Sequence, residues 1–221
     1  MKHLSATYRE LFSDPEYVKA FWGTLALFIL ALFINYFAAL YAADAVSNYV
    51  KDIILSNIPV FDVDGMFIFG PVVFWSVVGI ICILEPRKVP FVFKCIAAFI
   101  IIRSLFITLT HLGPYPDRIP LGIHTMLLNR WNLGNLLTFG SGGDLFFSGH
   151  TGLPFLMALV FWKNVRMRIF CLFGAAFFGA VVLLGHLHYS IDVLSAFFIT
   201  YTIFCICEWL FKKDQRLFYR A

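Results

Sequence analysis

The stretch AFWGTLALFILALFINYFAALYAA, residues 20–43, holds no charged side chain. A helix of about 20 apolar residues is long enough to cross the hydrocarbon core of a bilayer. Over the whole chain 61% of the residues are apolar and only 14% are charged, a composition that excludes an ordinary soluble domain. The sequence therefore predicts an all-α membrane protein. Its six transmembrane helices are expected near residues 20–43, 65–84, 89–112, 145–162, 169–191 and 193–207.

The chain is expected to form a single membrane domain over residues 1–221, because it contains no repeat, low-complexity tract or linker. Residues 1–19 are a cytoplasmic N-terminal segment whose apolar residues are spaced for one face of a short interfacial helix. Within it, Asp14, Pro15 and Glu16 have the order of an N-cap, a first-turn proline and a first-turn acid. The six-helix bundle follows over 20–211, and residues 212–221 are a basic cytoplasmic tail.

The basic residues predict the orientation of the bundle. With alternating connections, thirteen Lys and Arg residues lie on the side of both termini and three on the other side. The thirteen are Lys2, Arg9, Lys19, Arg87, Lys88, Lys94, Lys163, Arg166, Arg168, Lys212, Lys213, Arg216 and Arg220, and the three are Lys51, Arg118 and Arg130. Cytoplasmic loops carry the excess of positive charge, so both termini are expected in the cytoplasm. These residues form no patch interleaved with aromatic side chains, so nucleic acid is not an expected partner.

Polar residues collect at the opposite, outer face. In GGDLFFSGHTG, residues 142–152, Asp144 lies just outside the fourth span and Ser148 is placed to cap it. Gly149 lets the backbone approach a ligand, and the first-turn amides favour an anion such as phosphate. His150 in that first turn can exchange a proton with an oxygen of the anion. Ser148 and Gly149 are equally consistent with a simple helix start.

A second cluster, GHLHYSIDV at residues 185–193, belongs to the same face. His188 and Asp192 are four residues apart, which places them one turn apart if the chain is helical there. Asp192 can then hold one ring nitrogen of His188 and leave the other as a nucleophile. Two alternatives stay open. Asp192 caps the sixth span, or His186, His188 and Asp192 bind a metal, although their spacing matches no common metal site.

Arg103 is a charge inside the third span, where a functional role is the default interpretation because a buried charge is expensive. By position it lies in the outer half of its helix, and its guanidinium can bind a phosphate with two hydrogen bonds. The alternative is that the side chain reaches out to lipid headgroups. Since the predicted topology brings Arg103, His150, His188 and Asp192 to one side of the membrane, we expect a shared active site.

Two motifs together resemble the type 2 phosphatidic acid phosphatase superfamily. They are Gly143-Asp144-x3-Ser148-Gly149-His150-Thr151 and His186-x-His188-Tyr189-x-x-Asp192-Val193, and they are most similar to its sphingomyelin synthase-like branch. The stretch from Arg103 to Pro114 also resembles an earlier motif of that branch. The resemblance therefore covers residues 95–200, and the six expected spans agree with it.

The resemblance implies a catalytic triad of His150, His188 and Asp192 that works without a metal or another cofactor. In that scheme His188 attacks phosphorus, a phosphohistidine forms, and His150 protonates the departing oxygen. The phosphate or the rest of the substrate is expected to contact Arg103, Asp144, Ser148, Gly149, Thr151, His186 and Tyr189.

One departure from the family pattern bears on the substrate. The phosphatase members carry a Lys-x6-Arg-Pro motif and an Arg six residues before the nucleophilic His, whereas this chain has no such motif and has Val182 at that position. Fewer basic groups favour a phosphodiester over a doubly charged phosphomonoester. The expected activity is cleavage of a phospholipid headgroup phosphate, or its transfer to a lipid alcohol such as a ceramide or to water. The alternatives are a monophosphatase of phosphatidate, phosphatidylglycerophosphate or polyprenyl diphosphate, and a non-catalytic lipid carrier.

The expected location is a bacterial inner membrane with a periplasmic active site, or the lumenal face of an organelle in a eukaryote. The largest outer loop, residues 113–145, is expected to lie along the interface and to cover part of the site. The sequence makes no prediction of oligomeric state.

Overall fold

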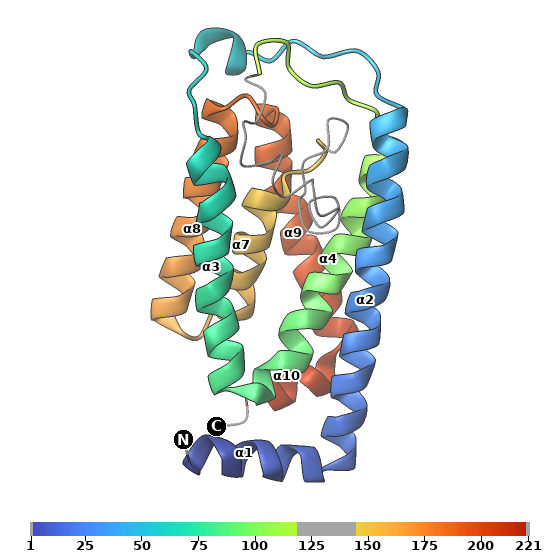
Figure 1. Ribbon diagram of the computed structural model, residues 1–221, viewed down its shortest axis with the longest axis vertical. Coiled ribbons are helices and arrows are strands. Elements are labelled where there is room, and N and C mark those ends of the chain that lie inside the picture. The colour runs from blue at the N-terminus through green and yellow to red at the C-terminus, as the bar shows by residue number, and fades with distance from the viewer. Residues whose placement is uncertain (1, 119–144, 220–221) are drawn as a thin grey trace.

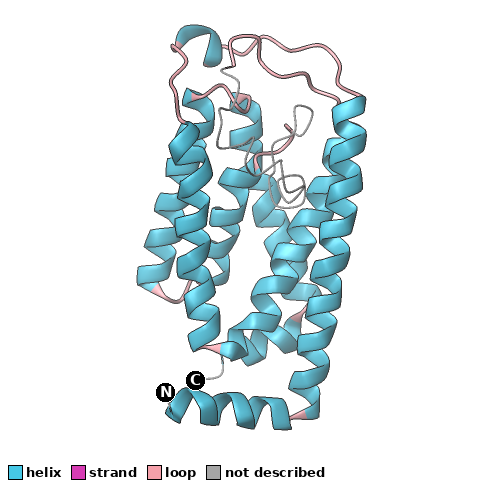
Figure 2. Ribbon diagram, viewed as in Figure 1, coloured by secondary structure: helices cyan, strands magenta, loops and turns pink. Residues whose placement is uncertain are grey.

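The computed structural model describes residues 2–118 and 145–219, and every regular element in these ranges is a helix (Figure 2). The elements are α1 (Lys2–Ser13), α2 (Pro15–Asp44), η1 (Leu55–Asn57), α3 (Asp64–Leu84), η2 (Pro86–Lys88), α4 (Val89–Leu109), α7 (Gly149–Val160), α8 (Val165–Leu184), α9 (Ser190–Leu210) and α10 (Lys212–Tyr219). Figure 1 shows α2, α3, α4, α7, α8 and α9 side by side in one bundle. The predicted all-α fold class is confirmed for the described ranges.

Five of these helices are long and apolar enough to cross a membrane: α2, α3, α8, α9 and the continuous segment Pro86–Leu109 that contains α4. Their outer surfaces carry large apolar side chains, for example Phe37 on α2, Val73 on α3 and Phe198 on α9, each more than 60% exposed. Such a surface is unfavourable in water but is the ordinary surface of a helix that faces lipid. The chain is therefore an integral, multi-pass membrane protein.

The expected fourth span, 145–162, is not a full-length helix, so the count of six spans is not confirmed. α7 has 12 residues and begins only at Gly149. At about 1.5 Å per residue it is about 18 Å long, whereas a bilayer core is about 30 Å thick. Leu145, Phe147 and Ser148, which precede α7, are buried in protein. Non-helical backbone at membrane depth is tolerated in that situation, because protein groups can satisfy its N–H and C=O groups.

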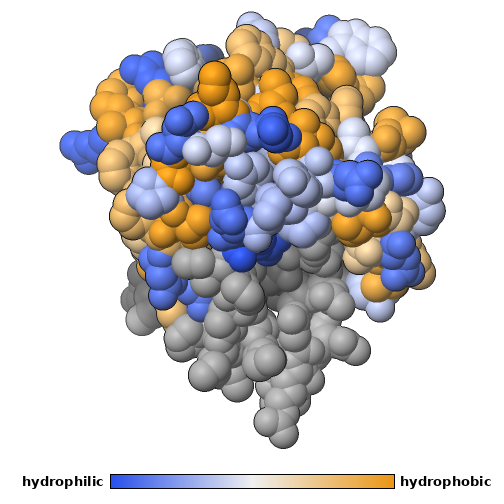
Figure 3. Space-filling model, turned by 90° about the horizontal axis from the view of Figure 1, so that it is seen from above, coloured by the Kyte–Doolittle hydropathy of each residue, from blue (hydrophilic) through white to orange (hydrophobic). Residues whose placement is uncertain are grey.

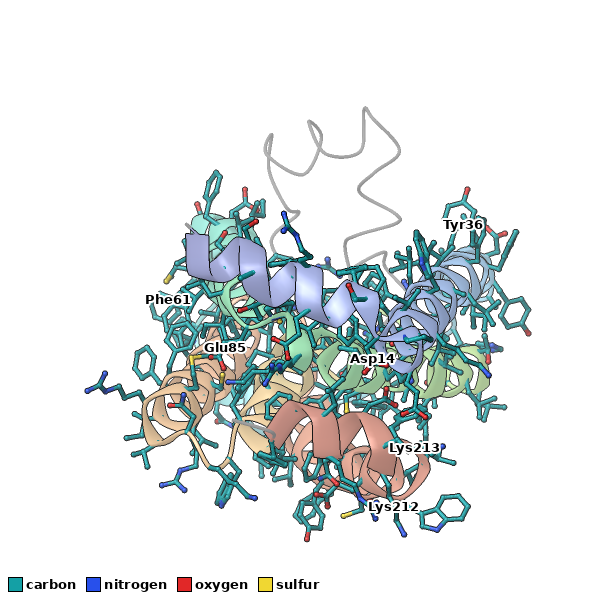
Figure 4. The ribbon with its side chains drawn as sticks, turned by 90° about the horizontal axis from the view of Figure 1, so that it is seen from below. Asp14, Tyr36, Phe61, Glu85, Lys212 and Lys213 are labelled. Carbon is teal, nitrogen blue, oxygen red and sulfur yellow. The ribbon has the colours of Figure 1, made fainter. Side chains whose placement is uncertain are left out.

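One end of the bundle carries both termini and two short amphipathic helices, α1 and α10 (Figure 1). Figure 4, which looks at this end, shows α1 lying across it and Lys212 and Lys213 on α10 beside it. The predicted start of α2 is confirmed, since Asp14 accepts a hydrogen bond from the backbone N–H of Glu16 at 2.9 Å. The expected basic tail is instead mostly helical: Asp214 of α10 is buried and pairs with Lys94 of α4 at 2.7 Å.

The core of the bundle lies where α7 packs between α8, α9 and α4. Gly152 of α7 allows the closest approach, because a Cβ atom there would lie 2.7 Å from the Phe99 ring of α4 and 2.9 Å from Thr200 Oγ1 of α9. On the far side of α4, α2 packs along its length. These contacts hold the first turn of α7 deep inside the bundle.

At the other end, two connections run over the tops of the helices and bind one another. Ser47 N–H donates to the carbonyl of His111 at 2.9 Å, and Gly113 N–H donates to the carbonyl of Asn48 at 3.2 Å. Seen from above, the described part of this end has hydrophilic residues spread among hydrophobic ones (Figure 3). Residues 119–144 lie outside the described residues, and with them most of the expected loop 113–145.

Candidate active site

The first turn of α7 and the first turn of α9 meet inside the half of the bundle that lies away from the two termini. Ser148 caps α7, and its Oγ accepts hydrogen bonds from Thr151 N at 3.4 Å and from Thr151 Oγ1 at 3.3 Å. The backbone N–H of Ser148 donates to the carbonyl of Asp192 at 3.1 Å. Two helix N-termini, each with the positive end of a helix dipole, are thereby tied together.

His188 lies between the two helices and is oriented through one ring nitrogen. Its Nδ1 is 2.8 Å from the carbonyl oxygen of Leu145 and 3.4 Å from Oδ2 of Asp192. Both of these partners are acceptors only, so Nδ1 must carry the proton. The lone pair is then on Nε2, and the side chain is 4% exposed, which shields this nitrogen from bulk water. When the ring is neutral, this geometry leaves one available nucleophilic nitrogen, Nε2.

Asp192 has two tasks that use the same oxygen. Its Oδ2 accepts from the backbone N–H of Tyr189 at 2.9 Å, which caps α9, and it also contacts Nδ1 of His188. The condition for placing His188 and Asp192 on one helical face, a helix that contains both, is not met. α8 ends at Leu184 and α9 begins at Ser190, so His188 precedes the helix whose third residue is Asp192. The capping role that was left open as an alternative and the contact with His188 are both present.

Arg103 is fully buried on α4 and points to the segment that leads into α7. Its Nε donates to the carbonyl of Phe147 at 2.8 Å. The residue next to it, Ser104, is 3.5 Å from Oδ1 of Asn35, a buried polar residue of α2. The guanidinium is therefore a fixed cation beneath the start of α7, and the alternative that it reaches lipid headgroups is not what the structure shows.

His150 in the first turn of α7 is stacked on an aromatic side chain of α3. Its ring centroid is 4.2 Å from that of Phe67, with an angle of 26° between the planes. His188 and Arg103 lie close enough to the His150 ring to interact with it electrostatically. Its Nδ1 is buried without a hydrogen-bond partner among the described residues. A second imidazole thus stands beside the first, with an apolar wall behind it.

The remaining predicted site residues lie in the first turn of α7, in the segment before α9 and outside the described residues. Gly149 is the first residue of α7, and Thr151 bonds to Ser148 as described above. His186 is buried with a φ of 50° and packs edge-on against Tyr115 at 5.2 Å. The hydroxyl of Tyr189 donates to Gly113 O at 2.7 Å and accepts from Val50 N at 3.2 Å, so it ties together the connections at the end of the bundle opposite the termini. Asp144 lies outside the described residues.

Sequence reasoning missed three contributors to this site. The carbonyl of Leu145 is a backbone group and has no signature in the side-chain sequence. Phe67 is one apolar residue among many in the second span. Asp52 bonds to Ser190 at the start of α9, and nothing in its local sequence, which also holds Lys51 and Asp62, sets it apart.

A hollow of about 540 Å³ lies at the opposite end of the bundle and is lined by Lys163, Glu208, Gln215, Arg216 and Tyr219. None of the candidate site residues lines it. Its walls offer two cations, a carboxylate that is bonded to Gln215, and no histidine. We therefore place the chemistry at the meeting point of α7 and α9.

Comparison with known proteins bears on the same helices. Residues 141–210 match the family model described as PAP2 superfamily C-terminal, and this range contains His150, His188 and Asp192 but not Arg103. No curated protein and no solved structure gave a match. The family match over α7, α8 and α9 supports placing the chain in the type 2 phosphatidic acid phosphatase superfamily.

Proposed function

We propose that this protein cleaves or transfers the headgroup phosphate of a phospholipid through a phosphohistidine on His188. Members of the superfamily act on lipid phosphates in membranes, which supports a lipid phosphatase-type reaction as the general class. The observation that carries the proposal is the hydrogen bonding of His188, since two acceptors on Nδ1 leave Nε2 as the nucleophile.

In the first half-reaction the Nε2 lone pair of His188 attacks phosphorus, and an N–P bond forms. The P–O bond to the diacylglycerol breaks, and His150, protonated once the anionic phosphate is bound beside it, gives its proton to the departing oxygen. Positive charge develops on the His188 ring and is stabilised by Asp192. Arg103 and the first-turn amides of α7 stabilise the phosphoryl oxygens.

In the second half-reaction His150 is neutral and acts as the base. It takes the proton of an acceptor hydroxyl, whose oxygen attacks phosphorus while the N–P bond breaks and His188 regains its lone pair. A lipid alcohol as acceptor makes the protein a synthase of the sphingomyelin synthase-like kind. Water as acceptor makes it a phospholipase C.

The charge of the site favours a phosphodiester substrate. Where the phosphatase members have an arginine, Val182 is fully buried in a cluster with Val63, Phe67 and Leu187. Arg103 is bonded to the segment that leads into α7. This fixed cation and two helix dipoles suit the single negative charge of a diester better than the double charge of a monoester. The family match favours the rival proposal, a lipid monophosphatase, so the test has to include a monoester.

The test uses purified protein in mixed micelles that contain phosphatidylcholine, phosphatidylethanolamine and phosphatidate, with and without ceramide. Mass spectrometry follows every product. His188→Ala is the inactive variant. His111→Ala is its matched control. His111 lies in the connection that follows α4, and its ring nitrogen Nε2 contacts the nearby carbonyl of Thr108.

Each outcome selects one function. Diacylglycerol with a phosphorylated ceramide establishes a synthase, and diacylglycerol with free phosphocholine or phosphoethanolamine establishes a phospholipase C. Diacylglycerol and inorganic phosphate from phosphatidate alone would overturn the diester argument and establish a monophosphatase. Turnover no faster than that of His188→Ala on every lipid would refute catalysis and favour the lipid carrier.

A further inference from the structure

Asp52 lies in the connection between α2 and α3 and bonds to two separate elements. Its Oδ1 accepts from the backbone N–H groups of Ile54 at 2.8 Å and Leu55 at 3.2 Å. Its Oδ2 accepts from Ser190 twice, from the backbone N–H at 2.7 Å and from Oγ at 2.8 Å. The residue is 6% exposed. One carboxylate therefore joins the outer connection to the start of α9.

Ser190 lies midway between the two residues of the proposed relay, two positions after His188 and two before Asp192. Its backbone N–H is one of the first-turn donors of α9 that no intrahelical acceptor can satisfy. Two carboxylates thus hold neighbouring amides of one helix start: Asp192 holds Tyr189 N–H, and Asp52 holds Ser190 N–H. These bonds fix two adjacent residues within the short stretch that carries His188 and Asp192.

The same connection also supports the other partner of His188. Leu55 is 2% exposed and packs in one cluster with Leu145 and Tyr189. The carbonyl of Leu145 is the acceptor 2.8 Å from Nδ1 of His188. The connection therefore contacts the nucleophile's surroundings at two points, through the Asp52 carboxylate on α9 and through the Leu55 side chain on Leu145.

The charge of Asp52 suits this role. Burial alone raises the pKa of its carboxyl group, but the four hydrogen bonds from Ser190, Leu55 and Ile54 lower it, and the net pKa lies below the usual range. Asp52 is consequently ionised at neutral pH. A carboxylate at a helix N-terminus is also favoured by the helix dipole.

We propose that Asp52 is a positioning residue for His188: by holding Ser190 and the 54–55 turn together, it fixes the start of α9 and the Leu145 carbonyl relative to each other. Asp52 touches no reacting atom and acts only through these groups. The inference rests on the proposed function of His188 as the nucleophile.

The test compares three variants of the full-length protein in the micelle assay. Asp52→Asn places an amide N–H₂ against backbone donors on one side, and we expect kcat to fall about tenfold with KM changed less than twofold, because a misplaced nucleophile slows chemistry more than binding. Ser190→Ala removes only the Oγ bond, and a loss of about threefold in kcat is expected. Asp62→Asn is the matched control, since Asp62 is an exposed acid of the same connection with one local bond to Asp64 N–H.

A second readout does not depend on turnover. ¹⁵N NMR of histidine-labelled protein, with the His188 signal assigned by its loss in His188→Ala, reports which ring nitrogen carries the proton. Wild type and Asp62→Asn are expected to show Nδ1–H alone, whereas Asp52→Asn is expected to show a mixture of tautomers.

The two readouts separate the inference from the proposed function. A wild-type protein that turns over no lipid but whose His188 signal changes in Asp52→Asn would refute the function and keep the positioning role. An active wild type whose kcat and His188 signal are both unaffected by Asp52→Asn would overturn the positioning role. A lower melting temperature without any change in kcat or in the His188 signal would also overturn it, because it would show that Asp52 serves stability alone.

Discussion

Replacing Asp192 with asparagine tests how His188 is held. Asparagine has the same shape and keeps an oxygen that can accept from Tyr189 N–H, so the cap of α9 survives. The shorter contact of His188 Nδ1 is the one to Leu145 O, at 2.8 Å against 3.4 Å to Asp192. Since the carbonyl remains, the ring should keep its proton on Nδ1. What the variant loses is the negative charge beside the ring.

The magnitude follows from the distance. Two unit charges separated by the 3.4 Å of this contact interact by about 5 kcal/mol at an effective dielectric constant of about 20. If about half of the positive charge has developed on the ring in the transition state, the loss is about 2.5 kcal/mol, which corresponds to a fall in kcat of about 10²-fold. Losing the tautomer as well would cost more, since the equivalent substitution in a Ser–His–Asp triad lowers kcat about 10⁴-fold.

The assay is diacylglycerol release at saturating phospholipid, with the His188 tautomer read by ¹⁵N NMR and Asp62→Asn as control. A fall of about 10⁴-fold together with a proton on Nε2 would refute the reasoning, because Asp192 and not the Leu145 carbonyl would then set the tautomer. A fall of less than about threefold would refute it in the other direction, because Asp192 would then be only a helix cap.

Three further predictions concern other parts of the site. His150→Gln should lower kcat about 10³-fold on natural lipid but far less on a substrate with a nitrophenolate leaving group, which needs no proton; equal losses on both would contradict a general-acid role. Gly152→Ala should destabilise the bundle by about 1–3 kcal/mol in a chemical unfolding titration, because its Cβ would lie 2.7 Å from the Phe99 ring. The control Gly79→Ala in α3, which has open space around it, should be neutral or stabilising. The reverse order of stabilities would contradict the packing. Because the pKa of Asp52 is lowered in the folded state, its ionised form stabilises the protein above the unfolded value of about 3.9, and this contribution is lost as the pH falls through the folded value. The stability difference between wild type and Asp52→Asn should therefore be constant near neutral pH and shrink below about pH 4, and a difference that grows on acidification would show that the carboxylate is not the stabilising form.

Local signals in the sequence predicted most of the long helices. The uncharged runs give α2, α3 and α9 within about five residues of their ends, because lipid-facing helices need apolar residues continuously. The run expected as a span over 169–191 does not give the end of α8, which stops at Leu184. Asp14, Pro15 and Glu16 place the start of α2 because a cap is decided by neighbouring residues. The outer-half position of Arg103 follows from counting along one helix.

The bonds that organise the site were beyond prediction because they join distant residues or use the backbone. Asp52 and Ser190 are separated by 138 positions, and nothing in either local sequence names the other. Tyr189 was predicted to contact the substrate, and its hydroxyl bonds to the Gly113 carbonyl and to Val50 N–H, two partners that no local pattern around Tyr189 indicates.

The late start of α7 and the hydrogen bonds of the candidate site depend on the same backbone groups. If the helix extended outward to residue 145, the carbonyls of Leu145 and Phe147 would accept from the backbone N–H groups four residues later, as in any helix. In the structure these two carbonyls instead accept from His188 Nδ1 and Arg103 Nε, and Ser148 N–H donates to Asp192 O. Inside a membrane the released backbone groups need protein partners, and here those partners include the proposed nucleophile and the proposed phosphate-binding cation. A helix that stops half-way across the bundle beside buried His, Arg and Asp residues therefore marks the place where the backbone itself has become part of the site.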